Sequence, residues 1–265
     1  MQEGCLKKLT YQVQSDGKVV YDLNLNSEKI PINDLLGKKI SLTNLNQINC
    51  VHCGKKTKKS FSQGHCYPCF RNLAYTDLCQ VRPETCHFHL GTCRDDSWAQ
   101  KNCFIKHTIY LAVSSGLKIG ITRAYQEQNR WIDQGASYAL PIARVYTRKD
   151  SGLIESSLSK YIADKTNWRK MLLGDLPQLD LKNKREEIWN LFPEDVNHEK
   201  LHEEEVRTFH YPVIEPPKKI KSFNLDKSPQ IEDLLQGVKG QYLIFATGVI
   251  NIRKYSGYQV ALQIH

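Results

Sequence analysis

The chain has 265 residues and a formal charge of +9, with 40% hydrophobic and 25% charged residues. This composition is typical of a globular protein and excludes collagen, coiled coil and general disorder as descriptions of the whole chain. The first residues contain no secretory signal, and the longest apolar stretch, residues 242–250, is too short to cross a bilayer. We therefore expect a cytoplasmic protein with no membrane partner. The positive charge favours an acidic partner, such as nucleic acid or an anionic surface.

The first 49 residues predict short β-strands. Tyr11 and Val13, and then residues 19–25, alternate apolar with polar positions. Asp16 and Gly17 between these runs form a hairpin-turn signal. We expect an N-terminal β segment over residues 1–49.

Cysteine is the most unusual feature of the composition, because eight of the nine cysteines lie within residues 50–103. In a long chain without an export signal, an odd total of cysteines, nearly all in one region, favours metal ligation over disulfides. We therefore predict a zinc-ribbon-like, cysteine-rich region over residues 50–103 whose order depends on metal.

The first cysteine cluster is a pair of C-x2-C motifs formed by Cys50, Cys53, Cys66 and Cys69. Two thiolates separated by two residues reach one metal ion from a tight turn, and two such turns complete the tetrahedron that zinc accepts. Gly54 suits the sharp turn after the second ligand. Four protein ligands leave no open position, so the pattern predicts a structural zinc ion.

A lysine-rich loop lies between these two motifs and contains no acidic residue. Such a loop favours contact with phosphates without reading of base sequence, although a solvated hairpin tip is the structural alternative. The candidate nucleic-acid-binding residues are Lys55, Lys56, Lys58, Lys59 and Arg123.

A second cluster combines four cysteines with three histidines: Cys79, Cys86, Cys93, Cys103, His87, His89 and His107. These residues favour a second zinc site, built from four thiolates or from three thiolates and one imidazole. An iron–sulfur centre is an alternative, and so are reduced cysteines that pack as small apolar side chains.

The chain changes character after residue 104. Two β-rich runs, residues 108–113 and 117–122, flank a tight-turn sequence, and a helix is expected over residues 125–134, ending at Gly135. A strand over residues 142–147 and a helix capped by Asp150 or Ser151 follow.

Two motifs in this region, Thr108-Ile109-Tyr110 and residues 118–122 (K-I-G-I-T), resemble the paired strands that open a GIY-YIG endonuclease domain. Arg130, Glu155 and Asn167 extend the resemblance over about residues 104–170. The whole chain also resembles an uncharacterised bacterial family that joins zinc-type cysteines to such a domain.

This resemblance implies a small mixed sheet flanked by helices over residues 104–180, and hydrolysis of a nucleic-acid phosphodiester with one divalent metal ion. Tyr110 corresponds to a general base or water-positioning group, and Lys118 stands where many members have a second tyrosine. Arg130 corresponds to the arginine that steadies the phosphate, Glu155 to the carboxylate that holds the metal ion, and Asn167 to a later polar residue. A single carboxylate suits Mg²⁺.

Each of these residues also has a purely structural interpretation. Tyr110 would be a core tyrosine, Lys118 and Arg130 would be solvated charges, and Glu155 would be a first-turn acid favoured by the helix dipole.

The remainder of the chain divides into two segments. Residues 181–230 predict a solvated acidic helix, interrupted by Pro193, and an extended connector over residues 207–230. Residues 231–265 predict a β unit with a hairpin near Thr247 and Gly248. Residues 32–36 recur in similar form at residues 231–235, either by chance or because the two ends pair in one β unit.

Together these features predict an α+β protein that is stabilised by one or two zinc ions and binds DNA or RNA. The function expected is that of a Mg²⁺-dependent nuclease. One alternative is a DNA- or RNA-binding protein that retains the fold without catalysis. The other is a zinc-dependent protein-interaction module that uses the acidic residues 182–205 and the lysine-rich loop.

Overall fold

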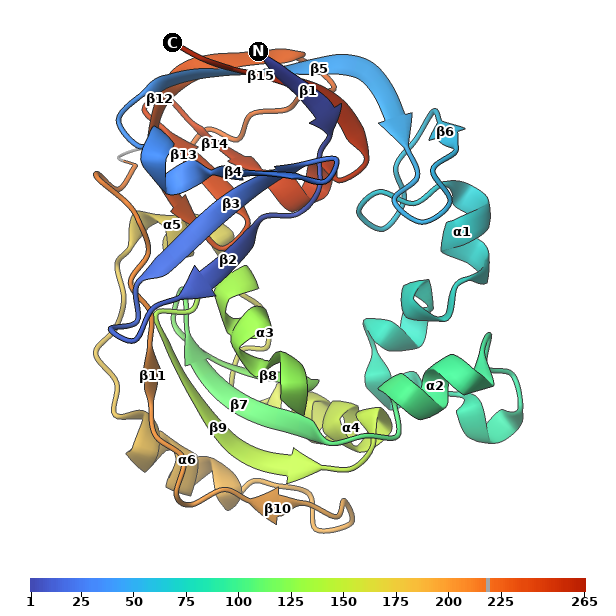
Figure 1. Ribbon diagram of the computed structural model, residues 1–265. Coiled ribbons are helices and arrows are strands. Elements are labelled where there is room, and N and C mark those ends of the chain that lie inside the picture. Colours follow the sequence, from blue (N-terminus) through green and yellow to red (C-terminus); the bar gives the residue numbers. More distant parts are fainter. Residues whose placement is uncertain (218–219) are drawn as a thin grey trace. The chain divides into compact units, whose positions relative to one another are not determined.

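The computed structural model describes residues 1–217 and 220–265. It is an α+β protein in which short helices accompany several antiparallel sheets (Figure 1). The chain folds into two compact units: unit 1 contains residues 1–71 and 209–265, and unit 2 contains residues 72–208. This division differs from the five predicted segments, because the N-terminal and C-terminal segments belong to the same unit.

Unit 1 contains a seven-stranded sheet in the order β1-β15-β5-β12-β13-β14, with β6 paired to β5. Its strands are β1 Gln2–Cys5, β5 Lys39–Asn49, β6 Lys56–Thr57, β12 Gln230–Lys239, β13 Tyr242–Phe245, β14 Val249–Asn251 and β15 Tyr258–Ile264. A three-stranded sheet consists of β2 Thr10–Val13, β3 Val19–Leu25 and β4 Glu28–Pro31. The two 3-10 turns are Ile32–Leu35 and Ile252–Tyr255, and the helix α1 is Tyr67–Asn72.

The pairing in unit 1 follows the apolar alternation of the sequence. Tyr11 pairs with Tyr21, which confirms the hairpin predicted around Asp16 and Gly17. The C-terminal strand β15 lies between β1 and β5, so the two ends of the chain share one sheet. The similar sequences 32–36 and 231–235 nevertheless differ in structure, because the first forms a 3-10 turn and the second lies in β12.

Unit 2 contains a five-stranded sheet in the order β10-β9-β7-β8, with β11 also paired to β9. Its strands are β7 His107–Val113, β8 Leu117–Arg123, β9 Tyr138–Val145, β10 Glu199–Lys200 and β11 Arg207–Thr208. Its helices are α2 Asp96–Asn102, α3 Glu127–Asp133, α4 Arg148–Leu158, α5 Trp168–Leu173 and α6 Leu181–Trp189. Its 3-10 turns are Ala74–Thr76, Leu78–Gln80, Pro83–Thr85, Phe88–Leu90 and Ala124–Gln126. The strand pairs described in this sheet are antiparallel, so the prediction of a mixed sheet is wrong.

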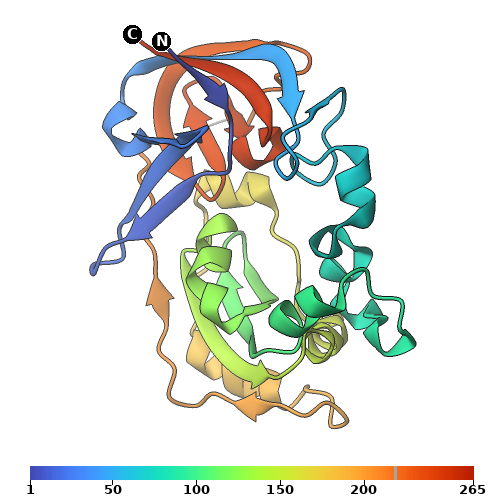
Figure 2. The same cartoon turned by 45° about the vertical axis from the view of Figure 1, so that its right-hand side comes forward.

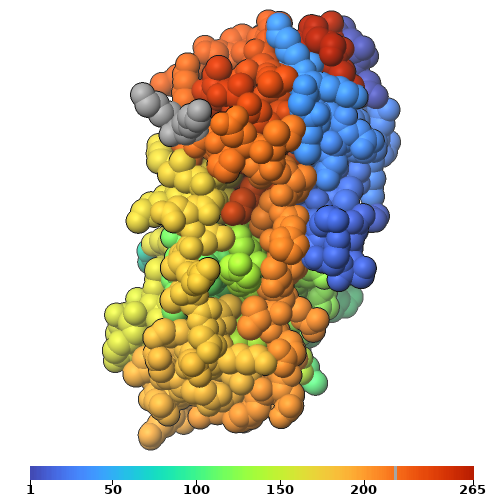
Figure 3. Space-filling view, turned by 90° about the vertical axis from the view of Figure 1, so that its left-hand side faces the viewer, coloured from blue at the N-terminus to red at the C-terminus, as the bar shows by residue number. Residues whose placement is uncertain are grey.

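The two faces of this sheet carry different side chains. Ile109 and Leu111 of β7 and Ile119 of β8 pack in an apolar core with residues of α4 and α6. Successive side chains of a strand point to opposite faces, so Tyr110 and Gly120, which pair across β7 and β8, lie on the other face. There Tyr110 packs against Trp131 of α3. Figure 3 shows the gold and orange surface that α6 and the residues after it form on unit 2.

Several predicted element boundaries change in the structure. Helix α4 begins at Arg148 with Thr147 as its cap, not with Asp150 or Ser151, because Asp150 N donates to Thr147 Oγ1 at 3.0 Å. Helix α3 ends as predicted, and Gly135 after it has a positive φ of 66°.

The predictions after residue 180 also change. The helix of the acidic segment stops at Trp189, before Pro193. The predicted connector includes residues 218 and 219, which lie outside the described residues. No helix among residues 1–217 and 220–265 is long and apolar enough to cross a membrane.

Candidate functional site

The first cysteine cluster lies in unit 1, where β5 ends. Its four sulfur atoms, from Cys50, Cys53, Cys66 and Cys69, lie within 4.8 Å of one another. The turn after β5 is closed by Gly54 N, which donates to Cys50 O at 2.9 Å, and Gly54 has the positive φ of 72° that its position requires. Cys69 lies on α1 and Cys66 immediately precedes it. The second pair therefore opens a helix, so the zinc-ribbon-like prediction does not describe this segment.

These sulfur atoms fit zinc. In a regular tetrahedron with metal–sulfur bonds of about 2.3 Å, neighbouring sulfurs lie about 3.8 Å apart. Cys53 Sγ and Cys66 Sγ are 3.8 Å apart. Burial raises the pKa of the Cys50 thiol, but backbone N–H groups of Cys53, Cys66 and His52 outweigh it and lower that pKa to about 6. Burial and the neighbouring thiols of Cys66, Cys53 and Cys50 raise the pKa of Cys69 to about 12. The four cysteines together could hold one zinc ion.

The lysine-rich loop extends from this cluster. Its four lysines, Lys55, Lys56, Lys58 and Lys59, are exposed, and Lys56 lies in the short strand β6. Phe61 at the end of the loop packs against Tyr67 and Phe70 of α1. Tyr67 is 51% exposed, so an aromatic ring lies on the surface beside this aromatic group. The sequence interpretation did not include Tyr67.

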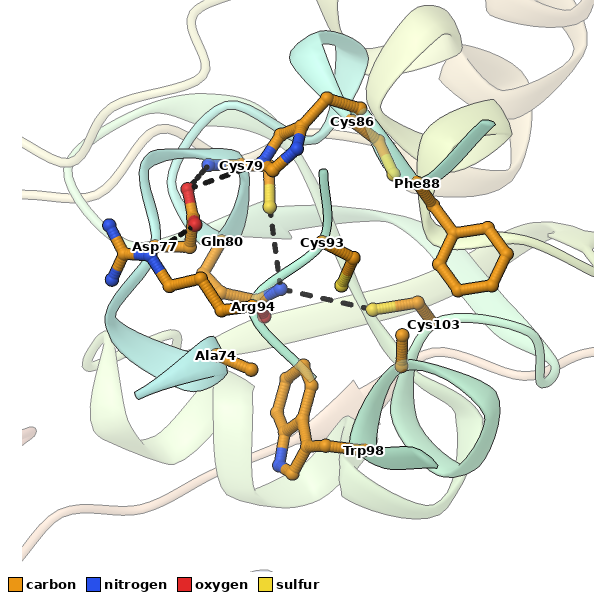
Figure 4. A pocket seen from close by; sticks show the side chains of 12 residues that line it. Ala74, Asp77, Cys79, Gln80, Cys86, Phe88, Cys93, Arg94, Trp98 and Cys103 are labelled. Carbon is orange, nitrogen blue, oxygen red and sulfur yellow. Dashed lines mark hydrogen bonds and ion pairs between the residues drawn. The ribbon is translucent and has the colours of Figure 1, made fainter. Parts of the chain in front are cut away.

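The second cysteine cluster surrounds one cavity of about 20 Å³ in unit 2 (Figure 4). Cys79, Cys86, Cys93 and Cys103 all line it. The amide of Gln80 lies among them, with its Nε2 3.9 Å from Cys79 Sγ and 3.8 Å from Cys103 Sγ. The group whose ligand atoms already lie within 4.8 Å of one another is a different trio, Asp77, Cys79 and His87.

The three candidate histidines of this cluster differ in position. His87 lines the cavity, and its Nδ1 lies 2.8 Å from Thr92 Oγ1. His89 is exposed and does not line it. His107 also lies outside the lining: it is fully buried at the start of β7, and burial lowers its pKa to about 4.

The candidate catalytic residues lie on unit 2. Tyr110 is fully buried, and its hydroxyl donates to Gln134 Oε1 at 3.2 Å. A bulge lies at this point of the β7–β9 pairing, where Ile109 faces Ala143 and Tyr110 faces Pro141. A β-bulge redirects a side chain, and bulges are common beside active sites. Gly120 opposite has no room for a side chain, because a Cβ there would lie 2.5 Å from Tyr110 Oη.

Charged groups surround this tyrosine. Burial raises the pKa of Tyr110 to about 12. The nearby Arg130 lowers this pKa and Glu155 raises it, but both effects are smaller than that of burial. Burial lowers the pKa of Lys118 to about 8, assisted by Arg130. Burial raises the pKa of Glu155 to about 7, against the opposing effects of Arg130 and Lys118. Glu155 therefore links the group, because Arg130 and Lys118 act on its carboxyl and it acts on Tyr110.

Two further candidate residues, Asn167 and Arg123, have structural contacts. Asn167 caps α5, because its Oδ1 accepts hydrogen bonds from Arg169 N at 3.1 Å and Lys170 N at 3.3 Å. Arg123 donates from Nε to Asn102 O at 2.9 Å, and its guanidinium lies over the Trp98 ring. Its contacts hold the cysteine-rich segment against the sheet.

Three residues near this group were not expected from the sequence. Gln134 orients the phenol of Tyr110, and Asp164 is a second carboxylate acting on Lys118 and Glu155. The backbone explains the position of Asp164, since Ile119 N of β8 donates to Ala163 O at 2.9 Å. Arg148, at the start of α4, also lowers the pKa of Glu155 through its positive charge. No motif marks these three positions.

Comparison with curated proteins and with solved structures finds no match. One family matches residues 37–260, a range that includes both cysteine clusters and all the candidate catalytic residues. Its description states no activity, so the GIY-YIG resemblance stays a prediction. Because the match covers most of its length, the chain belongs to the family described as "Protein of unknown function (DUF2797)".

Proposed function

We propose that this protein is a zinc-stabilised nuclease that hydrolyses nucleic-acid phosphodiesters with Mg²⁺, through a divergent GIY-YIG-like centre. The observation that supports the proposal is that Arg130 and Lys118 act on the Glu155 carboxyl, while Arg130 and Glu155 act on the phenol of Tyr110. These groups come from two strands and two helices. No ion pair joins the charged members in the described part of the chain, so their charges are available to a phosphate and a cation.

Glu155 fits a ligand for Mg²⁺, with Asp164 as a second negative group nearby. Mg²⁺ binds through one or two carboxylates together with water and substrate phosphate. When bound, it supplies positive charge that stabilises the pentacoordinate phosphorus. In this proposal, a zinc ion at the first cluster stabilises the fold and takes no part in catalysis. A zinc ion at the second cluster would bring the total to two.

Each side chain then has one task. Arg130 is exposed and binds the scissile phosphate through its guanidinium. Lys118, whose pKa is lowered to about 8, accepts the proton of the attacking water in its neutral form. A water–phosphorus bond forms, the phosphorus–oxygen bond to the leaving nucleotide breaks, and a proton returns to that oxygen.

The phenol of Tyr110 orients neighbouring groups and does not take part in proton transfer. It is fully buried, its pKa is raised to about 12, and its proton is directed at Gln134. It therefore stays protonated at neutral pH. Of the two roles expected from the resemblance, these properties favour orientation of its neighbours over general-base catalysis.

The lysine-rich loop of unit 1 supplies a separate surface for nucleic acid. Four exposed lysines attract phosphates, and the half-exposed ring of Tyr67 offers a stacking surface for a base. Neither feature distinguishes one base sequence from another. We therefore expect binding to DNA or RNA with little sequence preference.

The experiment uses the full chain, with plasmid DNA, single-stranded DNA and RNA as substrates in Mg²⁺. Glu155→Gln should reduce cleavage at least about 100-fold, a loss typical of removing one electrostatic catalytic group. The matched control is Glu194→Gln, which alters an exposed acid of the same unit and should leave cleavage unchanged. Equal cleavage by the wild type and Glu155→Gln would contradict the assignment.

The second candidate is a DNA- or RNA-binding protein without catalysis, and the full burial of Tyr110 favours it. It predicts salt-dependent binding of the same substrates with no cleavage at any Mg²⁺ concentration. The protein-interaction module has weaker support, because Glu187, Glu204 and Glu205 of the acidic segment already pair with cations of unit 2.

A further inference from the structure

The cysteine-rich segment over residues 72–106 has little apolar burial to hold it in place. Its regular structure consists of four 3-10 turns and the short helix α2. Its only buried residues among those described are Ala74, Thr76, Pro83, Ala99 and Cys103. Segments with so small a core are usually held by disulfides or by metal, and the cysteines here are free thiols.

The four cysteines of this segment share one space. They come from separate turns of the chain, and Figure 4 shows their sulfur atoms around the amide of Gln80. The cavity, about 20 Å³, is close to the space that one water molecule needs, about 10–15 Å³. It accommodates a single ion.

An arginine beside this space, half-buried and with its Nε fully covered, lacks a carboxylate partner. Arg148 donates from Nη2 to Gln80 O at 2.6 Å, while its Nε is buried without a hydrogen-bond partner. Among residues 1–217 and 220–265 no acid forms an ion pair with it. Arg148 acts on Glu155 without forming an ion pair with it. Because an unpaired cation away from water is costly, a negative charge closer to the guanidinium is favoured. Cys79 and Cys103 are the thiols that interact electrostatically with Arg148. Arg123 interacts in the same way with Cys103.

Two polar side chains at the rim of the cavity, Asp77 and His87, already have partners. Asp77 accepts an ion pair from Arg94 Nε at 2.6 Å and lies 3.6 Å from His87 Nε2. The other nitrogen of His87 is hydrogen-bonded to Thr92. The ion pair with Arg94 suits a residue that supports the loop. His87, with its Nδ1 held by Thr92, is the alternative to one of the thiolates, and its variant is therefore part of the test.

We propose that Cys79, Cys86, Cys93 and Cys103 bind one zinc ion, and that the resulting dianionic tetrathiolate is the charge partner of Arg148. Zinc carries two positive charges and four thiolates carry four negative ones, which leaves two negative charges beside Arg148 and Arg123. The Gln80 amide then moves from among the sulfur atoms to donate to them from outside. The site does not depend on phosphodiester hydrolysis.

The proposed site also fixes helix α4. The loop between Cys79 and Cys86 packs directly on this helix, since a Cβ on Gly152 would lie 2.5 Å from Glu84 N. Arg148 N donates to Cys103 O at 2.7 Å, so the first residue of the helix is held by the same segment. Figure 2 shows the yellow-green α4 almost end-on beside the cysteine-rich segment. The zinc ion therefore acts as a clamp on the helix that carries Glu155.

The test measures zinc per chain in the full-length protein, purified from zinc-supplemented medium. The wild type should contain two zinc ions with an all-sulfur coordination shell at about 2.3 Å by X-ray absorption. Cys86→Ser and Cys93→Ser should each retain one. Cys5→Ser, which removes the only cysteine outside both clusters, and His87→Asn and Asp77→Asn should retain two.

Hydrogen exchange provides the readout for the clamp. Amides of residues 148–158 should exchange at least about tenfold faster in Cys93→Ser than in Cys5→Ser, while the first cluster still holds its zinc and reports a folded unit 1. Unchanged exchange in α4 would overturn the clamp. The site itself would be overturned by one zinc ion per wild-type chain, by loss of zinc in His87→Asn or Asp77→Asn, or by iron with inorganic sulfide.

Discussion

At the scale of single residues, the candidate site leaves no room for a side chain at Gly120 beside Tyr110. The two residues face each other across β7 and β8, and the phenol occupies the place where a side chain at residue 120 would lie. The glycine of the K-I-G motif is therefore required by packing, whatever the protein does. This reason is physical and does not depend on the family resemblance.

We predict that Gly120→Ala destabilises the protein by about 1–3 kcal/mol, the usual cost of overpacking a core. The contact is local, so Tyr110→Ala should relieve most of that cost, and the double variant should be more stable than the sum of the single effects implies. Urea unfolding of the four proteins measures this coupling. Additive free energies of unfolding would show that the two side chains do not compete for space.

The pKa values of Lys118 and Glu155 predict how cleavage depends on pH. Glu155 must be ionised to hold Mg²⁺, and its pKa is about 7, while Lys118 must be neutral to accept a proton, and its pKa is about 8. Both requirements are met more fully as pH rises, so single-turnover rates should increase from about pH 6 to about pH 9. Lys118→Gln should lower the rate and remove the part of the increase that lies around the pKa of Lys118. A rate that falls above neutral pH would contradict these roles.

Burial of Glu155 also has a cost in stability. Its folded-state pKa is raised above the ordinary value, so its contribution to stability is present below about pH 4.5 and is lost as pH rises through about 7. Without Mg²⁺, Glu155→Gln should therefore be more stable than the wild type at about pH 8, by about 1–3 kcal/mol, and not at about pH 4.5. Thermal unfolding at both pH values, with Glu194→Gln as the control, measures the difference. An equal effect at the two pH values would mean that ionisation of Glu155 is not the cause.

At the scale of elements, local patterns predicted the hairpins well. The β2–β3 and β7–β8 hairpins formed where apolar alternation flanked a turn sequence, because each depends on neighbours in the chain. The start of α4 was misplaced since Thr147, Asp150 and Ser151 are all good caps, and only the backbone geometry selects Thr147. The C-x2-C spacing was enough to predict the first cluster, because each pair of sulfur atoms is positioned by a single turn.

The lysine-rich loop gives a prediction at this scale. Changing Lys55, Lys56, Lys58 and Lys59 to Gln should weaken binding to a fluorescent oligonucleotide. The slope of log K against log salt should fall by about 0.7–0.9 for each phosphate that the loop no longer neutralises. The control changes four exposed lysines elsewhere in unit 1 to Gln, which removes the same charge: Lys7, Lys29, Lys38 and Lys227. An equal decrease of affinity in both variants would indicate a general charge effect with no role for the loop.

At the scale of the whole molecule, the two units differ in how the chain forms them. Unit 2 is one continuous segment, residues 72–208, whereas unit 1 combines residues 1–71 with residues 209–265. Unit 2 contains its own apolar core, the second cysteine cluster and the candidate catalytic residues. It therefore has what an independent domain needs.

We predict that residues 72–208 fold as a separate protein and unfold in one cooperative transition, measured by circular dichroism. A shorter fragment, residues 104–208, should be less stable, because it exposes the surface of α4 against which Pro83 and Glu84 pack. Failure of the longer fragment to fold would show that unit 2 needs unit 1. Equal stability of the two fragments would show that the cysteine-rich segment adds nothing to α4.

The sequence by itself determined the features that depend on neighbouring residues: the α+β class, the two hairpins, the end of α3 at Gly135, and the four-cysteine cluster. Tertiary structure alone decided that the two ends of the chain share a sheet, because strands β1 and β15 come from opposite ends of the sequence and pair only in the folded chain. It also decided that Arg130 and Lys118 act on Glu155, and that Arg148 lies half-buried beside free thiols. Burial and charge depend on what the folded chain places around a side chain, and no local pattern records those neighbours.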